Sequence, residues 1–341
     1  MLRGALLGLG NVALEAHLPG WTRRDDVEIV AVTDVAPARR ASVTPLLPGA
    51  RWYDSAAALL DAERLDFVDI CTPPSSHAGL IAEALGRGLH VLCEKPLVCA
   101  GEDLDALTRL AERDARVLHT VHNWHHAPII RRTAELVAKG AIGRLTRIGW
   151  ATLRTAPAAV RDAQAQNWRL DPKLAGGGIL TDHGWHVFYL LQRWMGSTPT
   201  AVSALLQTRR HTAWPVEDTA TVHLEFPEGG SAEIFLTWAA DRRQNRVELI
   251  GTKGRRLELE DSTIVLTDYA DEQRWSCPPA LSQGSAHPDW FDPVVQQFVG
   301  EVRGQVARDG NLAEAALCLR LETLARESAR QNGRWLRVSA P

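Results

Sequence analysis

The first part of the chain alternates between short apolar runs and segments whose apolar residues recur with helical spacing. Apolar runs typical of buried strands lie at 4–10, 27–33, 67–71 and 90–93, and segments with helical spacing lie at 55–62 and 76–86. This alternation of strand-like runs with helical segments predicts an α/β domain built on a parallel, doubly wound sheet. The ligand crevice of such a sheet lies at the carboxyl ends of its strands.

The pattern changes after about residue 122. Runs at 145–153, 219–226, 231–238, 246–250 and 256–259 are predicted as strands, and turns such as the Pro-Glu-Gly-Gly sequence at 227–230 separate them. A final helical segment is predicted at about 312–332. We therefore divide the chain into a first domain at 1–122 and a second, α+β domain at 123–341, whose last helices could pack back onto the first.

Composition favours two soluble globular domains in a chain of 341 residues. Hydrophobic residues make up 45% and charged residues 23%, and the net charge of −3 creates no field that would attract nucleic acid or an anionic membrane. No uninterrupted apolar stretch reaches the roughly 18 residues that a membrane span needs. The five cysteines are odd in number and scattered, which indicates reduced thiols and a cytoplasmic location.

A glycine turn follows the first apolar run, with the spacing Gly8-x-Gly10-x-x-Ala13. The first glycine permits a tight turn, the second lets the backbone approach a pyrophosphate, and the small third residue lets helix and strand pack closely. A structural turn would give the same pattern, but Asp34 ends the next strand, where a dinucleotide site places the acid that binds the ribose hydroxyls. This carboxylate favours NAD over NADP, although Arg39 leaves NADP open.

Polar motifs follow two further strands, namely Thr72-Pro73-Pro74 with His77, and Glu94-Lys95-Pro96. A lysine at the mouth of the crevice can donate a hydrogen bond to a substrate hydroxyl and stabilise developing alkoxide charge. The alternative interpretation is a surface lysine whose stem covers apolar surface.

The run Gly-Gly-Gly-Ile-Leu-Thr-Asp-His-Gly-Trp-His at 176–186 places Asp182 and His186 four residues apart. At helical spacing these side chains share one face. A histidine that titrates near neutral pH, beside an acid that can fix its tautomer, is suited to exchanging a proton with a substrate hydroxyl. The alternative is an amphipathic core helix whose polar residues bond locally.

Together these motifs resemble the Gfo/Idh/MocA oxidoreductases, the group of glucose-fructose oxidoreductase and inositol dehydrogenase. The resemblance covers nearly the whole chain, and its specific part is Glu94-Lys95-Pro96 combined with GGG-x-L-x-D-x-G-x-H at 176–186. It implies an N-terminal Rossmann domain and a C-terminal α+β domain with a large, mostly antiparallel open sheet. Such sheets often build dimers or tetramers, so a homodimer or homotetramer is expected.

The resemblance also implies that Lys95, Asp182 and His186 are the catalytic residues. We expect His186 to remove the hydroxyl proton as hydride leaves the same carbon for the nicotinamide. Asp182 would orient the imidazole and the substrate, and Lys95 would bind the reacting oxygen. A lysine from the nucleotide-binding half and an acid–histidine pair from the other half would thus act on one substrate carbon.

Other residues complete the expected site. The candidate cofactor-binding residues are Gly8, Leu9, Gly10, Asn11, Val12, Asp34, Arg39, Thr72, Pro73, Pro74, His77, Glu94, Lys95 and Asn123. The candidate substrate-binding residues are Lys95, His122, Asn123, Trp168, Arg169, Asp182, His183 and His186. The segment 122–126 is rich in histidine, but no metal is expected, because the family's chemistry needs none and adjacent histidines rarely bind one ion.

The sequence thus predicts an oxidoreductase that transfers hydride between NAD, or NADP, and a carbon of a sugar, sugar derivative or cyclitol. One alternative is a reductase of another C=O or C=N substrate, and a second is a hydrolase that oxidises its substrate transiently with tightly held NAD. A third is a non-catalytic dinucleotide sensor or regulator, because the fold alone guarantees no chemistry.

Overall fold

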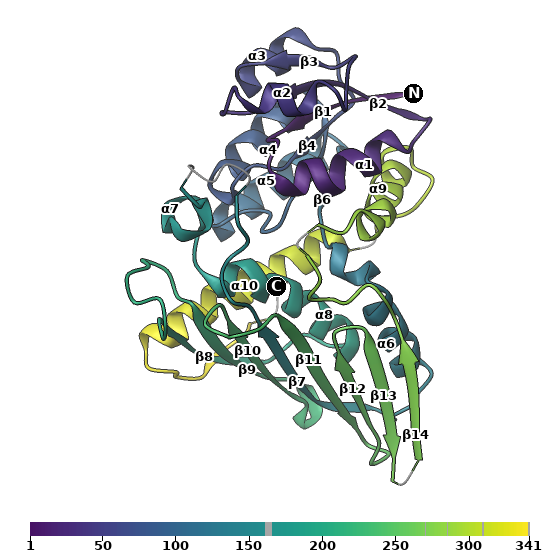
Figure 1. Ribbon diagram of the computed structural model, residues 1–341, viewed down its shortest axis with the longest axis vertical. Coiled ribbons are helices and arrows are strands. Elements are labelled where there is room, and N and C mark those ends of the chain that lie inside the picture. Colours follow the sequence, from purple (N-terminus) through teal and green to yellow (C-terminus); the bar gives the residue numbers. More distant parts are fainter. Residues whose placement is uncertain (161–165, 270, 285, 309, 340–341) are drawn as a thin grey trace. The chain divides into compact units, whose positions relative to one another are not determined.

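The computed structural model describes residues 1–160, 166–269, 271–284, 286–308 and 310–339 (Figure 1). The chain forms two compact units. The first unit comprises Met1–Asn123, Ala159–Trp168 and Ser285–Ala316. The second unit comprises Trp124–Ala158, Arg169–Gly284 and Leu317–Pro341. Among the described residues, no helix is both long and apolar enough to cross a membrane.

The first unit is built on a six-stranded sheet of order β3-β2-β1-β4-β5-β6, with every pair parallel. The strands are β1 (Leu2–Leu7), β2 (Val27–Thr33), β3 (Arg51–Tyr53), β4 (Phe67–Ile70), β5 (His90–Cys93) and β6 (Leu118–Thr120). The predicted doubly wound parallel sheet is therefore confirmed. Strand order reverses between β1 and β4, which is the position where ligands bind to open α/β sheets.

Helices cover this sheet. They are η1 (Ala13–His17), α1 (Leu18–Thr22), α2 (Arg39–Val43), α3 (Ala56–Ala62), η2 (Pro74–Ser76), α4 (His77–Gly86), α5 (Gly101–Arg113) and α9 (Pro288–Val302). Ser55 caps α3 by accepting a hydrogen bond from the amide of Ala58, as its position before an apolar run suggests. η1 is a single wide turn of π-helix that continues into α1.

Residues 286–308 and 310–316 return from the far end of the sequence to complete the first unit. The ring of Phe291 on α9 stacks on His17 with centroids 3.9 Å apart, and Phe298 meets Phe67 at 5.6 Å. The Asn311 side chain bonds both the amide and the carbonyl of Thr120 on β6, which covers an edge strand that would otherwise expose unpaired backbone groups.

The second unit contains a nine-stranded sheet of order β14-β13-β12-β11-β7-β10-β9-β8-β15. The strands are β7 (Leu145–Leu153), β8 (Ala201–Gln207), β9 (Thr219–Glu225), β10 (Ser231–Thr237), β11 (Gln244–Gly251), β12 (Arg256–Glu260), β13 (Thr263–Asp268), β14 (Asp271–Ser276) and β15 (Leu336–Arg337). Only β7 and β10 pair in parallel, so the expected large, mostly antiparallel sheet is confirmed.

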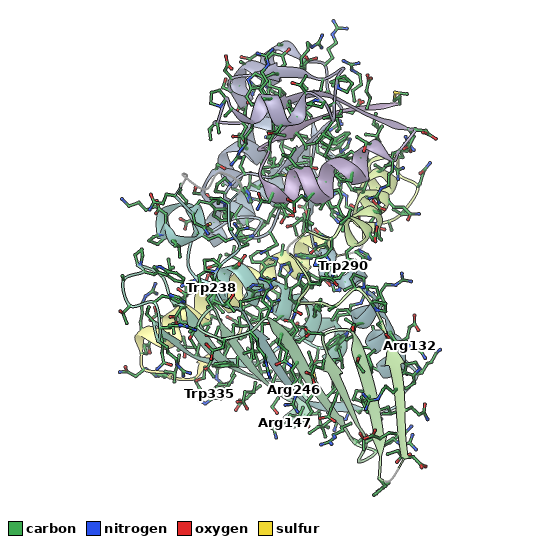
Figure 2. All side chains as sticks on the ribbon, in the orientation of Figure 1. Arg132, Arg147, Trp238, Arg246, Trp290 and Trp335 are labelled. Atoms are coloured by element: carbon green, nitrogen blue, oxygen red, sulfur yellow. The ribbon has the colours of Figure 1, made fainter. Side chains whose placement is uncertain are left out.

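The remaining elements are η3 (Asn123–His126), α6 (Pro128–Ala138), η4 (Trp168–Leu170), α7 (Pro172–Ala175), η5 (Leu180–Gly184), α8 (Trp185–Met195), η6 (Pro227–Gly229) and α10 (Asn311–Arg330). α8 packs against β7, and α6 against β13. On β7, Ile148, Trp150 and Thr152 are buried while Arg147 on the opposite face is exposed, and Figure 2 labels Arg147 and Arg246 among the side chains of this sheet.

Candidate active site

The glycine turn begins where β1 ends. Gly8 has a φ of +91°, and a Cβ there would lie 2.8 Å from Cγ2 of Thr72 and 2.9 Å from the carbonyl oxygen of Cys71. Glycine is therefore required, because the ends of β1 and β4 approach too closely for a side chain. The predicted strand at 4–10 ends at Leu7 for the same reason, since Gly8 leaves extended conformation and starts the turn.

Gly10 has a different environment. Its φ lies outside the left-handed region, and no heavy atom would lie within 4 Å of an added Cβ. The fold itself thus gives no reason for glycine here, whereas a pyrophosphate lying against the helix that starts at Asn11 would. Within the described part of the chain, Oδ1 of the neighbouring Asn11 is buried and has no hydrogen-bond partner. The residues present therefore fit a dinucleotide.

Asp34 follows β2 with its side chain 2% exposed. Its carboxylate accepts hydrogen bonds from the amide of Leu9 at 2.7 Å, the amide of Ala36 at 2.8 Å and the Arg39 guanidinium at 2.7 Å. The predicted acid thus lies at the end of β2, tied to the glycine turn. Arg39 pairs with this acid, so it neutralises part of the charge that would repel a 2′-phosphate.

We expect Gly10→Ala to weaken NAD binding by about tenfold, or about 1.4 kcal/mol, without lowering Tm. The added methyl group enters open space in the protein but obstructs the approach of a phosphate to the backbone. Gly49→Ala is the matched control, because Gly49 also has nothing within 4 Å and lies outside the turn. Calorimetric titration with NAD checks both variants, and equal affinity in all three proteins would contradict the assignment.

His77 joins two loops at the carboxyl ends of the strands. Nε2 of this buried ring lies 2.8 Å from the Thr72 carbonyl oxygen, and Nδ1 lies 2.8 Å from that of Pro96. Burial lowers the pKa of His77 below its ordinary value. Because both ring nitrogens face carbonyl groups of the chain, His77 holds the loop after β4 against the loop that carries Lys95.

Beneath Lys95 lies a buried polar network. Nδ1 of His17 lies 2.9 Å from Oδ2 of Asp69, and Nε2 lies 2.9 Å from Oε1 of Glu94. The second oxygen of Glu94 accepts a hydrogen bond from the Lys95 amide at 3.0 Å. Burial by itself lowers the pKa of His17, but interactions with Asp69 and Cys71 together raise it well above its ordinary value. The backbone of Lys95 is thus held by a buried ion network.

The ligand-type atoms of His17, Asp69 and Cys71 lie within 4.8 Å of one another. Metal ligation needs a thiolate and a neutral imidazole. Burial raises the pKa of the Cys71 thiol to about 12, while the pKa of His17 is raised in the direction that favours its protonated form. This cluster therefore fits an ion network better than a metal centre. The sequence pattern did not indicate this cluster, because His17 lies 52 residues from Asp69 and 54 residues from Cys71.

In the second unit, the three glycines lead into the helix that carries the predicted acid and base. This helix is not regular α-helix throughout, because Leu180–Gly184 forms a turn of π-helix before α8. Such turns are frequent at functional sites. Asp182 lies in the π-turn, and His186 lies on the first turn of α8.

Positive charges surround Asp182. One carboxylate oxygen lies 3.8 Å from Nε of Arg169, and the other lies 3.6 Å from Nε2 of His183. Burial lowers the pKa of Arg154 to about 10, helped by the charge of Arg243 and opposed by attraction to Asp182. Burial also lowers the pKa of Arg243, and attraction to Asp182 opposes that shift. Arginine charges thus act on the Asp182 carboxylate at the start of the helix.

His186 is held by two aromatic residues that the sequence did not assign. Its ring stacks on Trp124 with centroids 4.4 Å apart and planes 6° apart, and Nδ1 lies 2.9 Å from the Tyr189 hydroxyl. That hydroxyl also accepts a hydrogen bond from the Trp124 amide at 3.2 Å. The ring, 6% exposed, therefore has a fixed orientation. Trp124 lies in the histidine-rich segment that the sequence singled out.

The remaining predicted residues divide between the units. His122, Asn123 and Trp168 belong to the first unit, and Arg169 and His183 to the second. Nδ1 of His122 lies 3.0 Å from Oε2 of Glu314. In the second unit, the His125 ring packs against Tyr189 with centroids 4.5 Å apart and planes tilted by 43°.

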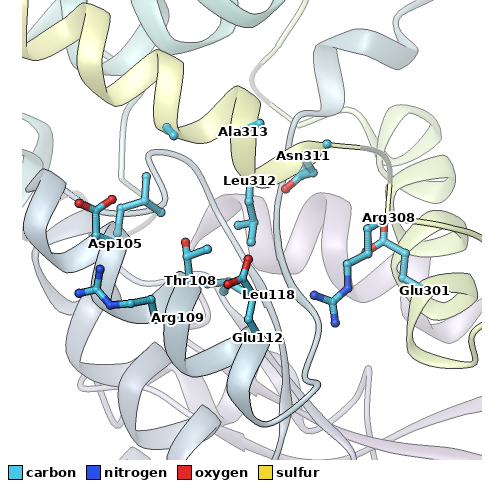
Figure 3. Close-up of a pocket in the computed structure, with 13 residues that line it drawn as sticks. Asp105, Thr108, Arg109, Glu112, Leu118, Glu301, Arg308, Asn311, Leu312 and Ala313 are labelled. Atoms are coloured by element: carbon cyan, nitrogen blue, oxygen red, sulfur yellow. The ribbon is translucent and has the colours of Figure 1, made fainter. Parts of the chain in front are cut away.

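A separate pocket of about 470 Å³ lies in the first unit, between α5 and the start of α10 (Figure 3). Arg109, Glu112, Arg308 and Asn311 are among its lining residues. None of the predicted site residues lines it, so it is not the candidate active site.

The chain matches two family models along most of its length. Residues 2–122 match the oxidoreductase family with an NAD-binding Rossmann fold, and residues 130–256 match the GFO/IDH/MocA C-terminal domain. The chain therefore belongs to the Gfo/Idh/MocA family of NAD-binding oxidoreductases.

Curated relatives and a solved structure agree with this. The chain is 31% identical to dTDP-3,4-didehydro-2,6-dideoxy-alpha-D-glucose 3-reductase of Streptomyces antibioticus, over 89% of each chain. It is 29% identical to D-apiose dehydrogenase of Paraburkholderia graminis, over 81% of this chain and 75% of that one. An oxidoreductase from Agrobacterium radiobacter, solved with NAD⁺, L-tartaric acid and magnesium, has the same fold, with a TM-score of 0.85, 21% identity and 98% of each chain covered.

Proposed function

We propose that the chain transfers hydride between NAD and a CH–OH or C=O carbon of a sugar, sugar derivative or cyclitol. The observation that carries this proposal is the fixed imidazole of His186, stacked on Trp124, on the same helix as Asp182. An oriented base on the same helix as an acid suits proton exchange with a hydroxyl. The names of the two relatives above, a sugar dehydrogenase and a sugar-nucleotide reductase, support the substrate class.

Each catalytic residue has a proposed task. His186 takes the proton from the substrate hydroxyl during oxidation and returns it during reduction. Asp182 keeps the imidazole and the substrate in orientation and stabilises the imidazolium that forms. The Lys95 ammonium group donates a hydrogen bond to the reacting oxygen and stabilises its developing negative charge. When bound, NAD supplies the nicotinamide carbon that accepts or donates the hydride.

We propose that the first unit binds the cofactor and the second carries most of the substrate contacts. Open space at Gly10 and the carboxylate of Asp34 support a pyrophosphate and a ribose site in the first unit. Arg169 and His183, which contact Asp182, are the proposed substrate-binding residues of the second. The proposed contributions of His122, Asn123 and Trp168 come from the first unit.

The proposal is tested by supplying the purified protein with a panel of polyols, aldoses and cyclitols plus NAD or NADP, and the corresponding ketoses plus NADH or NADPH. We expect absorbance at the NADH band to change with at least one member, and kcat/KM with NAD to exceed that with NADP by about tenfold or more. Comparable efficiency with NADP would contradict the role of Asp34. Tight NAD binding without any absorbance change across the panel would favour a sensor.

We propose a cytoplasmic location. No disulfide joins cysteines within the described residues, in keeping with a reducing environment. We propose a homodimer or homotetramer, as the family resemblance implies, without a nucleic-acid partner because the net charge is −3. Light scattering of the purified chain measures the assembly.

A further inference from the structure

One arginine far along the sequence lies directly against the glycine run that starts the catalytic helix. A Cβ on Gly177 would lie 1.7 Å from Nη2 of Arg326, and a Cβ on Gly178 would lie 2.0 Å from the carbonyl oxygen of Glu217. Backbone contact therefore requires glycine at 178, and a side chain at 177 would displace the Arg326 guanidinium. Arg326 lies on α10, a helix that also meets α8 where the Cys318 thiol bonds the Trp185 carbonyl at 3.5 Å.

Arg326 connects three partners. Nη2 donates hydrogen bonds to Thr181 Oγ1 at 2.7 Å, Glu217 Oε1 at 3.0 Å and Glu322 Oε1 at 3.0 Å. The Thr181 hydroxyl in turn donates to Glu322. Burial disfavours the guanidinium charge, but the Glu322 and Glu217 carboxylates raise the pKa of Arg326 above its ordinary value. The network is thus a closed set of charged hydrogen bonds, and the Thr181 side chain within it is buried.

The network also supplies the cap that the helix lacks. Among the described residues, no side chain at the N-cap bonds the π-turn, because the N-cap is Ile179 and three glycines precede it. Instead the amide of Ile179 donates to the Glu217 carbonyl oxygen at 3.1 Å, and the amide of Leu180 donates to the Glu217 carboxylate at 3.3 Å. An anionic group at a helix N-terminus is favourable, since it meets the exposed amides and the positive end of the dipole.

From these contacts we infer that Arg326 is a positioning residue. It fixes the π-turn through Thr181 and thereby determines the positions of Asp182 and His186. Thr181 directly precedes Asp182, so a change in its hydroxyl contact moves the carboxylate first and the helix next. This inference rests on the proposed function, because it assigns a catalytic purpose to that geometry. Small displacements of reacting groups can lower turnover by about 100-fold.

The test compares Thr181→Val with Thr181→Ser. Valine keeps the shape but removes both hydrogen bonds of the hydroxyl, whereas serine retains them. Arg326 itself is the weaker target, because its loss leaves two carboxylates without a partner and can prevent folding. Thr133→Val is the matched control, since Thr133 is a buried threonine of the second unit whose hydroxyl bonds only the Ile129 carbonyl of its own helix α6.

We expect Thr181→Val to lower kcat by about 10- to 100-fold with little change in NAD affinity, and Thr181→Ser to restore most of it. A second readout needs no substrate: the C2-proton exchange of each histidine against pH, followed by mass spectrometry. Thr181→Val should alter the exchange profile of His186, while Thr133→Val and Thr181→Ser leave it unchanged.

Two results would overturn the inference. One is wild-type kcat and an unchanged His186 profile in Thr181→Val, and the other is an equal loss of kcat in Thr133→Val, which would indicate general destabilisation. Failure of the proposed function is distinguishable, because the wild-type protein would then show no turnover while the exchange profile of His186 would still respond to Thr181→Val.

Discussion

Replacing His186 with alanine is expected to lower kcat by about 10² to 10⁴-fold while NAD affinity stays unchanged. The reason is that the imidazole supplies proton transfer in the step where the C–H bond breaks, and the cofactor contacts proposed above lie in the first unit. Stopped-flow measurement of NADH formation with the best substrate of the panel, at saturating NAD, measures this effect directly.

The control for this variant is His223→Ala. His223 lies on β9 of the same unit and is half-buried, outside every contact of the proposed site. It should keep wild-type turnover. Equal rates in the wild type and in His186→Ala would show that the proton passes through another group, and they would remove His186 from the mechanism.

Loss of the Lys95 ammonium group is the second large effect. Lys95→Met keeps a flexible stem of similar length, and we expect it to lower kcat by about 10² to 10³-fold, because a donor aimed at a developing oxyanion is worth this much. The backbone of residue 95 should keep its position, since the Glu94 carboxylate accepts a hydrogen bond from its amide at 3.0 Å.

Because the chain has few lysines, the effect of Lys95→Met can be compared with the same substitution at a lysine outside the proposed site. The chain has four lysines, at positions 95, 139, 173 and 253, and only Lys95 belongs to the first unit. Lys139→Met, at an exposed position after α6, is the control and should match the wild type. If Lys95→Met changed KM for NAD and left kcat intact, Lys95 would be a cofactor ligand and not a partner of the reacting oxygen.

Local sequence patterns predicted nine of the strands in the described residues, but not β3, β8, β13 or β15. The strands predicted at 27–33, 90–93 and 145–153 have those bounds in the structure. Strands buried on both faces form continuous apolar runs, and half-buried strands alternate apolar with polar residues. Either pattern can be recognised in the sequence. β14 was missed, because Asp271–Ser276 is a polar edge strand without either pattern. β6 has only three residues, too few for a period to show.

Long-range contacts account for what the sequence could not indicate at the site. His17 meets Asp69 and Glu94, which lie 52 and 77 residues away, and no periodicity relates them. Arg326 meets Thr181 across 145 residues. Trp124 could be suspected only because it lies among the histidines at 122–126. The π-turn at Leu180–Gly184 also has no local signal, since its cap comes from Glu217.

We propose that this chain moves a hydride from a substrate carbon to NAD. This claim is tested most directly by oxidising a substrate that carries deuterium on the carbon of the reacting hydroxyl, followed by NMR and mass spectrometry of the nicotinamide product. We predict one deuterium at C4 of the NADH, on a single face of the ring. Turnover of the labelled substrate without deuterium in the released NADH would contradict the claim.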